Sequence, residues 1–320
     1  MQTRTDSYER LSALLARTDD ASLRALLTGT ESTDGWGTHR VLDMHGAAVF
    51  AKTVPLTARE QAQPGSTGNL FGLPTFYSYG VGSGGFGVWR ELAMHHKTTA
   101  WVLDGAIDTF PLLLHHRVLP ISAPHKAMSR DELDEYVEYW DGSEEIRQFI
   151  LARQAATHEV VFFLEHVPHV LRTWLGSDPD RIALATDAMA RTTAFLRTRG
   201  VVHFDAHFGN ILSDGERVFL TDFGLALDRE FDLSQTERAF LDAHDHFDAG
   251  TFIRCLCHAL RALGGDLPAD TLATLRRYEP VSSAMDRVFA ALRSGPKHAA
   301  AHDDDELAGL LSATGWPGVS

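Results

Sequence analysis

The segment at residues 201–227 constrains this chain more than any other, because it sets polar side chains between short apolar runs. Its first turn, HFDAHFGN, carries Asp205 and Asn210, and the run VFLT leads directly to Asp222. Short apolar runs bounded by polar turns are typical of β-strands. We therefore expect two short strands here, which bring the three polar side chains into one site.

These three side chains are the ones that phosphoryl transfer from ATP requires. The reaction needs little covalent help, but it needs a carboxylate to orient the attacking hydroxyl and oxygen ligands to hold Mg²⁺ on the phosphates. Asp205 is placed to accept the proton of the acceptor. Asn210 and Asp222 offer an amide oxygen and a carboxylate to the metal ion. The pattern predicts a site for ATP and Mg²⁺.

The same residues carry a resemblance to the protein-kinase-like superfamily, which includes protein kinases and the aminoglycoside and choline phosphotransferases. His203-x-Asp205-x-x-x-x-Asn210, followed by Asp222-Phe-Gly, is similar to its two catalytic motifs in order and spacing. Each motif alone is also found as an ordinary polar turn or strand end, whereas two in register are far more specific. The resemblance implies an α+β, bilobal fold with a small lobe of antiparallel strands and a mainly helical larger lobe.

The resemblance also implies a lysine on a strand of the small lobe, held by a glutamate on a nearby helix. Lys52 ends the apolar run AVFAK, and Glu91 lies in the helical pattern WRELAMH. We expect this pair to hold the α and β phosphates. The interval between the two is longer than usual in protein kinases, which makes the intervening stretch an insertion. The alternative is a Glu91 that is merely a solvated helix residue.

Two glycine clusters compete for the phosphate loop. Gly35 and Gly37 lie before Lys52, where a loop between the first two strands is expected, and their backbone N–H groups are suited to phosphate oxygens. The cluster at 82–87 is more similar in sequence to the protein-kinase glycine loop, but it comes after Lys52 in the chain. Position therefore favours Gly35 and Gly37 for the phosphates and makes the second cluster a flexible cover.

The resemblance assigns adenine recognition to the backbone after a buried strand. The run VVFFL is followed by Glu165, whose carbonyl group would accept from the base, and by Val167, whose N–H would donate to it. A later Asp245, at the start of a helical pattern, is similar to the aspartate that braces the catalytic loop in this superfamily. An exposed Asp245 is the alternative.

Composition limits the class of partner. The formal charge of −14 over 320 residues would repel a nucleic-acid backbone, so we expect no nucleic-acid partner. No apolar run reaches the roughly 18 to 20 residues of a membrane-spanning helix, and the N-terminus has no signal-peptide pattern. We expect a cytoplasmic protein with no membrane partner.

The pattern of helices and strands changes near residues 165–180, from strand-rich to helix-rich. We expect an N-terminal helical preamble at 1–28, a small lobe with insertions at 29–167 and a larger lobe at 168–320. The stretch 55–87 is rich in Gly, Pro and Ser and favours an extended loop. The other expected features are helices at 89–102, 129–155, 180–199, 233–243, 247–263, 269–277 and 282–293, and a short acidic tail at 302–306.

The acceptor is constrained only weakly. Phe204 stands where many regulated protein kinases carry Arg, and the short stretch after Gly224 lacks the Ala-Pro-Glu motif, which leaves little chain to dock a peptide. The predicted function is transfer of the γ-phosphate to a hydroxyl of a small molecule or of a Ser/Thr side chain. The alternatives are a pseudokinase scaffold that binds nucleotide and the transfer of AMP to a protein.

Overall fold

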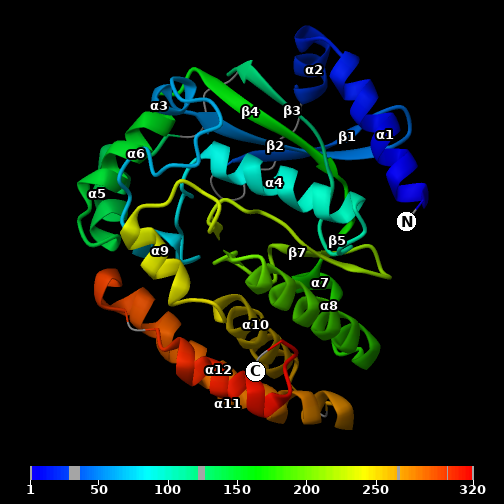
Figure 1. Ribbon diagram of the computed structural model, residues 1–320, viewed down its shortest axis with the longest axis vertical. Coiled ribbons are helices and arrows are strands. Elements are labelled where there is room, and N and C mark those ends of the chain that lie inside the picture. Colours follow the sequence, from blue (N-terminus) through cyan, green and yellow to red (C-terminus); the bar gives the residue numbers. More distant parts are fainter. Residues whose placement is uncertain (1, 29–36, 122–126, 265–266, 301, 319–320) are drawn as a thin grey trace. The chain divides into compact units, whose positions relative to one another are not determined.

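The computed structural model describes residues 2–28, 37–121, 127–264, 267–300 and 302–318. The chain divides into two compact units (Figure 1). Unit 1 consists of Met1–Pro74 and Gly84–Val167, and unit 2 consists of Thr75–Ser83 and Pro168–Ser320. Residues 75–83 therefore belong to unit 2, although they lie inside the range that the sequence assigns to the small lobe.

Unit 1 is built on a four-stranded antiparallel sheet in the order β1-β2-β4-β3. The strands are β1 (Thr38–Asp43), β2 (Ala48–Leu56), β3 (Leu113–Pro120) and β4 (His158–Glu165). His45 and Gly46 turn the chain between β1 and β2 with φ values of 57° and 82°, the signature of a tight two-residue hairpin. β4 has a neighbour on both sides, and its central six residues are buried.

One helix covers the core of this sheet. The helix α4 (Val88–Leu103) packs Trp89 and Leu92 into an apolar cluster with residues of β2, β3 and β4. Fully burying a side chain of this size contributes about 1.5–3 kcal/mol, so this cluster fixes α4 on the sheet. The other helices of unit 1 are α1 (Gln2–Arg17), α2 (Asp20–Leu27), α3 (Ala58–Gln61), α5 (Arg130–Tyr139) and α6 (Glu144–Gln154).

Glu60 joins the beginning and the end of the long stretch between β2 and α4, both of which belong to unit 1. Its carboxylate accepts from the N–H of Val88 at 2.8 Å, and its backbone oxygen accepts from the indole N–H of Trp89 at 2.9 Å. Glu60 also closes a capping box with Thr57 at the start of α3. The stretch expected as a loop thus contains α3 and a 3₁₀ turn, η1 (Thr75–Ser78), and α4 begins at a defined point.

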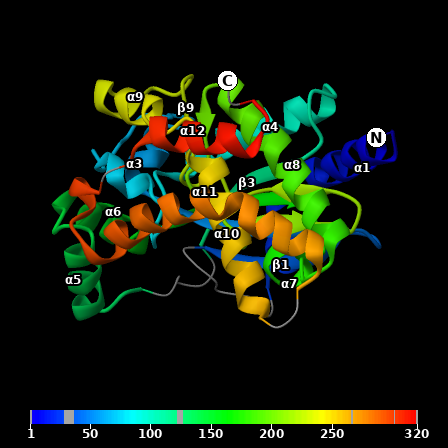
Figure 2. The ribbon, with the colours of Figure 1, turned by 90° about the horizontal axis from the view of Figure 1, so that it is seen from below.

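Unit 2 is mainly helical. Its helices are α7 (Leu171–Trp174), α8 (Pro179–Thr198), α9 (Gln235–Asp242), α10 (Phe247–Leu263), α11 (Ala269–Ser294) and α12 (Asp304–Thr314), with a short 3₁₀ turn η2 (Lys297–Ala299). Its short strands are β5 (His169–Val170), β7 (Ile211–Ser213) and β8 (Val218–Leu220) in one sheet, and β6 (Val201–Val202) with β9 (Leu227–Asp228) in another. α10 and α11 pack side by side, joined by an ion pair of 2.7 Å between Arg254 and Asp286 (Figure 2).

The expected boundaries fail at three places. The single helix expected at 129–155 is two helices, because Asp141 and Gly142 adopt positive φ values between them. The two helices expected around Pro280 are one helix, α11, in which burial of Tyr278 and Val281 outweighs the missing N–H of proline. The expected acidic tail at 302–306 opens α12, where its carboxylates lie in the first turn and interact favourably with the helix dipole.

The predicted α+β fold class is confirmed: unit 1 holds a small antiparallel sheet with one packed helix, and unit 2 is mainly helical. Within the described residues, no helix is both long and apolar enough to cross a membrane.

Candidate active site

Lys52 and Glu91 form an ion pair in unit 1. The Nζ atom of Lys52, on β2, lies 2.6 Å from Oε1 of Glu91, in the first turn of α4. Their side chains are 17% and 5% exposed, so Glu91 is not a solvated helix residue. The apolar packing of α4 on β2 brings together two residues that are 39 positions apart.

Gly37 is the member of the first glycine cluster that the structure describes, whereas Gly35 lies outside the described residues. A Cβ atom on Gly37 would lie 2.6 Å from the backbone oxygen of Thr53 and 3.9 Å from Cε of Lys52. No side chain fits at 2.6 Å from a backbone atom, so glycine is required here. The backbone at Gly37 therefore runs close beside Lys52.

The second cluster, at 82–87, is divided between the units, with Gly82 in unit 2 and Gly84 in unit 1. Its unit 1 part is held in place: Arg153 donates to the backbone oxygen of Gly84 at 2.8 Å. Gly87 caps α4 with a φ of 122°, which an L side chain rarely adopts. This part of the cluster serves to start α4 rather than to form a loose cover.

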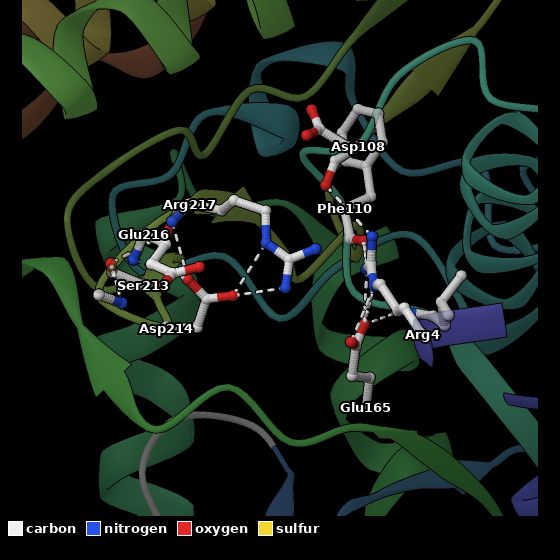
Figure 3. Close-up of polar contacts among 10 residues, drawn as sticks. Arg4, Asp108, Phe110, Glu165, Ser213, Asp214, Glu216 and Arg217 are labelled. Carbon is white, nitrogen blue, oxygen red and sulfur yellow. Dashed lines mark hydrogen bonds and ion pairs between the residues drawn. The ribbon is translucent and has the colours of Figure 1, made fainter. Parts of the chain in front are cut away.

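Glu165 and Val167 lie where the sequence places the adenine-binding backbone, at the end of β4 and just beyond it. The Glu165 carboxylate has a structural role that the sequence did not indicate. It accepts from Nη2 and Nε of Arg4, on α1, at 2.5 and 2.8 Å (Figure 3). Arg4 also donates to the backbone oxygen of Phe110 at 2.5 Å. Val167 is the last residue of unit 1.

Asp205 and Asn210 contact each other in unit 2. Nδ2 of Asn210 donates to Oδ2 of Asp205 at 2.8 Å and to its backbone oxygen at 3.0 Å. Because the amide nitrogen faces Asp205, the amide oxygen lies on the opposite branch. The Thr221 N–H donates to the backbone oxygen of Asn210 at 3.0 Å, next to Asp222. Asn210 and Asp222 therefore flank the same end of the β7–β8 hairpin.

The turn at the other end of this hairpin is rigid. Oδ2 of Asp214 accepts from Nη2 and Nε of Arg217 at 2.7 and 3.0 Å, and Oδ1 accepts from the backbone N–H groups of Glu216 and Arg217 (Figure 3). Burial alone would raise the pKa of Asp214, but these hydrogen bonds lower it below its ordinary value. The hairpin thus holds its open end, with Asn210 and Asp222, in a fixed register.

Two residues of the expected site have a left-handed backbone. φ is 64° at Phe204 and 67° at Asp222. Aspartate tolerates this region, but for a bulky aromatic residue it is a genuine outlier, and such strain persists only where the surroundings enforce it. Phe204 is fully buried and immediately precedes Asp205. Its strained backbone sets the direction from which Asp205 projects.

Asp248, and not Asp245, braces this loop. Its two carboxylate oxygens accept from the backbone N–H groups of His203 and Phe204 at 2.7 and 2.9 Å. Asp245 precedes the start of α10 at Phe247 and remains partly exposed, whereas Asp248 lies in the first turn and is buried. The prediction of Asp245 was wrong although the expected start of the helix at residue 247 was right, because the packing of α10 turns the buried Asp248 toward the loop.

Burial dominates the ionisation of Asp248. It raises the pKa of this carboxyl to about 7, although the two N–H donors act in the opposite direction. Charge repulsion from Asp205 also contributes to this raised pKa.

His207 has a defined tautomer. The Gly209 N–H donates to Nδ1 at 2.9 Å, so Nδ1 is an acceptor and the proton of the neutral ring resides on Nε2. Nε2 lies 3.5 Å from Oδ1 of Asp205, and the His207 side chain is 36% exposed. The loop therefore presents an N–H donor on the Oδ1 side of Asp205.

The residues present fit Mg²⁺. Within the part of the chain that the structure describes, no three or more His, Cys, Asp or Glu side chains cluster to hold a metal ion. Mg²⁺ does not need such a cage, since it takes one or two protein oxygens and completes its shell with water and substrate phosphates. The amide oxygen of Asn210 and the carboxylate of Asp222 provide such a pair.

Proteins similar to this chain are found among the solved structures. No protein-family model and no curated protein matches the chain. Among the solved structures, it is similar to one described as WaaP in complex with acyl carrier protein. The two chains are 14% identical, the match covers 85% of this chain and 87% of that one, and the TM-score is 0.39.

Proposed function

We propose that this protein is an ATP-dependent phosphotransferase that transfers the γ-phosphate to a hydroxyl group. The observation that carries the proposal is the contact between Asn210 and Asp205 at the open end of the hairpin that bears Asp222. It combines one carboxylate to orient a hydroxyl with two oxygen donors for a metal ion, as phosphoryl transfer requires.

Each residue has a distinct role in this proposal. Asp205 orients the acceptor hydroxyl and takes its proton as the oxygen attacks the γ-phosphorus. Asn210 and Asp222 would hold Mg²⁺, which neutralises charge on the phosphates when bound. The amide nitrogen of Asn210 also fixes the rotamer of Asp205.

The nucleotide is assigned to unit 1 residues. Lys52, steadied by Glu91, supplies a cation for the α and β phosphates, and the backbone at Gly37 runs beside it. Gly35 belongs to the same proposed phosphate loop. The backbone carbonyl of Glu165 and the N–H of Val167 would bind the adenine, with the Glu165 side chain already engaged by Arg4.

The test is Mg²⁺-dependent release of ADP by purified protein, with small alcohols and generic proteins as acceptors. The variants are Asp205→Asn, Asp222→Asn and Lys52→Met, and the control is Asp187→Asn, at an exposed carboxylate on α8. We expect each of the three to lower kcat/KM by about 100-fold or more, and the control to behave as wild type.

Three outcomes count against the proposal. Release of pyrophosphate in place of ADP would indicate transfer of AMP. Binding of ATP without turnover by any acceptor would favour a nucleotide-binding scaffold. Full activity of Asp205→Asn would remove Asp205 from the chemistry.

A further inference from the structure

Residues 75–83 form a strap within unit 2, whose middle residues 77–79 are buried. The chain leaves unit 1 after Pro74 and returns to it at Gly84. Between these points, η1 contacts α9, and Tyr77 and Tyr79 are 0% and 3% exposed. A surface loop would not bury two tyrosines, so this strap (residues 75–83) is an integral part of unit 2.

Tyr79 anchors the strap through one hydrogen bond. Its hydroxyl lies 2.8 Å from Nε2 of His244, and Nδ1 of His244 lies 2.6 Å from the backbone oxygen of Phe240. A carbonyl only accepts, so Nδ1 carries the proton and Nε2 accepts from the Tyr79 hydroxyl. Burial, followed by the neighbouring His302, lowers the pKa of His244 to about 4, which keeps the ring neutral.

The anchor is continuous with the catalytic loop. The ring of Tyr79 contacts those of Phe240 and Phe247 with centroids 5.4 and 5.5 Å apart, and it meets Phe204 edge to face at 6.4 Å. Such aromatic pairs contribute beyond their buried area. Phe204 is the strained residue before Asp205, so Tyr79 packs directly against the support of the proposed base.

The next residue, Gly80, lies against Asp205 itself. A Cβ atom on Gly80 would be 1.9 Å from Oδ1 of Asp205 and 2.8 Å from its Cγ. Gly80 is not among the described residues with positive φ, so its backbone would accept alanine and only the space forbids it. An alanine here would force the Asp205 side chain to move, because the strap touches the carboxylate.

Both oxygens of Asp205 thus have close neighbours. Oδ2 receives Nδ2 of Asn210, and Oδ1 lies between the backbone of Gly80 and Nε2 of His207. The side chain is 19% exposed. The carboxylate therefore offers only a small exposed area to an acceptor, and the strap borders that area at Gly80.

We propose that Gly80 is a positioning and specificity-determining residue: the strap holds Asp205 in its working rotamer and forms a wall of the acceptor site that admits a small alcohol and excludes a polypeptide. The proposal rests on the proposed function. A Ser or Thr of a polypeptide brings main chain on both sides of its hydroxyl and needs open surface beside the base. A small alcohol needs only the exposed part of the carboxylate.

The first experiment measures the contact without any catalysis. Gly80→Ala is made in three backgrounds: wild type, Asp205→Asn and Asp205→Ala. Asparagine keeps the volume of the carboxylate, whereas alanine removes it. We expect Gly80→Ala to lower Tm by roughly 4 °C or more in the first two backgrounds and by less than half as much in the third. Gly309→Ala is the control, because a Cβ atom there meets nothing within 4 Å.

The second experiment measures activity. ADP release is followed with choline, kanamycin and glycerol as small acceptors and with casein and myelin basic protein as polypeptides. We expect stimulation by a small acceptor only. We also expect Gly80→Ala to lower kcat by about tenfold or more with the KM for ATP changed less than about threefold, as for a displaced base.

The outcomes separate this proposal from the proposed function. Equal destabilisation by Gly80→Ala in all three backgrounds, or phosphorylation of the polypeptides as fast as the small acceptors, overturns the role of Gly80. A wild type that turns over no ATP with any acceptor overturns the proposed function and the acceptor class with it. In that case, a smaller loss of Tm from Gly80→Ala in the Asp205→Ala background would still show that the strap contacts Asp205.

Discussion

The Asp248 carboxylate holds Phe204 in a left-handed backbone conformation by accepting its N–H at 2.9 Å. The second oxygen of the same carboxylate accepts a hydrogen bond from the N–H of His203. A single buried side chain thus satisfies two donors of the catalytic loop. Both N–H groups would otherwise be buried without partners, at a cost of about 1–3 kcal/mol each. The strained Phe204 is thus supported directly from α10.

Replacing Asp248 with Ala should damage both stability and activity. We expect the free energy of unfolding to fall by roughly 2–5 kcal/mol, because two buried donors lose their acceptor. We expect kcat to fall further than the affinity for ATP, because Asp205 loses its support. Urea unfolding and steady-state kinetics measure both. Asp245→Ala is the matched control, and a larger loss there than at Asp248 would contradict our assignment.

The raised pKa of Asp248 predicts a pH dependence of stability. Its folded pKa, about 7, lies above its ordinary 3.8, so the folded state binds a proton that the unfolded state has released between these values. The contribution of this group to stability is fully present below about pH 4 and declines as pH rises through about 7. The expected slope is about 1 kcal/mol per pH unit between pH 5 and 7.

The test compares the wild type with Asp248→Asn, which does not titrate. Urea unfolding at several pH values should show a steeper loss of stability for the wild type as pH rises. Parallel curves for the two proteins would mean that Asp248 remains ionised throughout, with its two N–H donors outweighing burial.

His207 should affect turnover but not folding. Its side chain is 36% exposed and its neutral tautomer places an N–H 3.5 Å from Asp205. We expect His207→Phe to lower kcat by about tenfold or more, with stability changed by less than about 0.5 kcal/mol. The tautomer itself is measurable by ¹⁵N NMR of the imidazole, and a proton on Nδ1 at neutral pH would exclude this arrangement.

Arg4 should stabilise unit 1 from outside the proposed active site. Its side chain is 8% exposed and binds both the Glu165 carboxylate and the Phe110 carbonyl. Arg4→Met removes the counter-charge of this partly buried carboxylate and leaves it the N–H of Leu112. We expect a loss of about 2–4 kcal/mol in chemical unfolding. Arg10→Met, at an exposed position of the same helix, is the control. Equal effects of the two variants would show that the contact of Arg4 with Glu165 contributes nothing.

Local pattern determined much of this protein. The proximity of Asn210 and Asp222 is encoded locally, because a short turn at Asp214 can join β7 and β8 only as an antiparallel hairpin. The helices from α8 to α10 follow their apolar periodicity closely. The α+β fold class could be predicted from the family resemblance that this segment carries, and the contact of Asp205 with Asn210 depends on a short stretch of chain.

Tertiary packing decided the rest. The sequence cannot distinguish Asp245 from Asp248 as the brace, and neither the contact of Gly80 with Asp205 nor that of Arg4 with Glu165, 161 positions apart, has a local signal. The 39-residue interval from Lys52 to Glu91 is bridged only once α4 buries its apolar face on the sheet. Periodicity reports which face of an element is apolar, but burial and shape decide what that face meets.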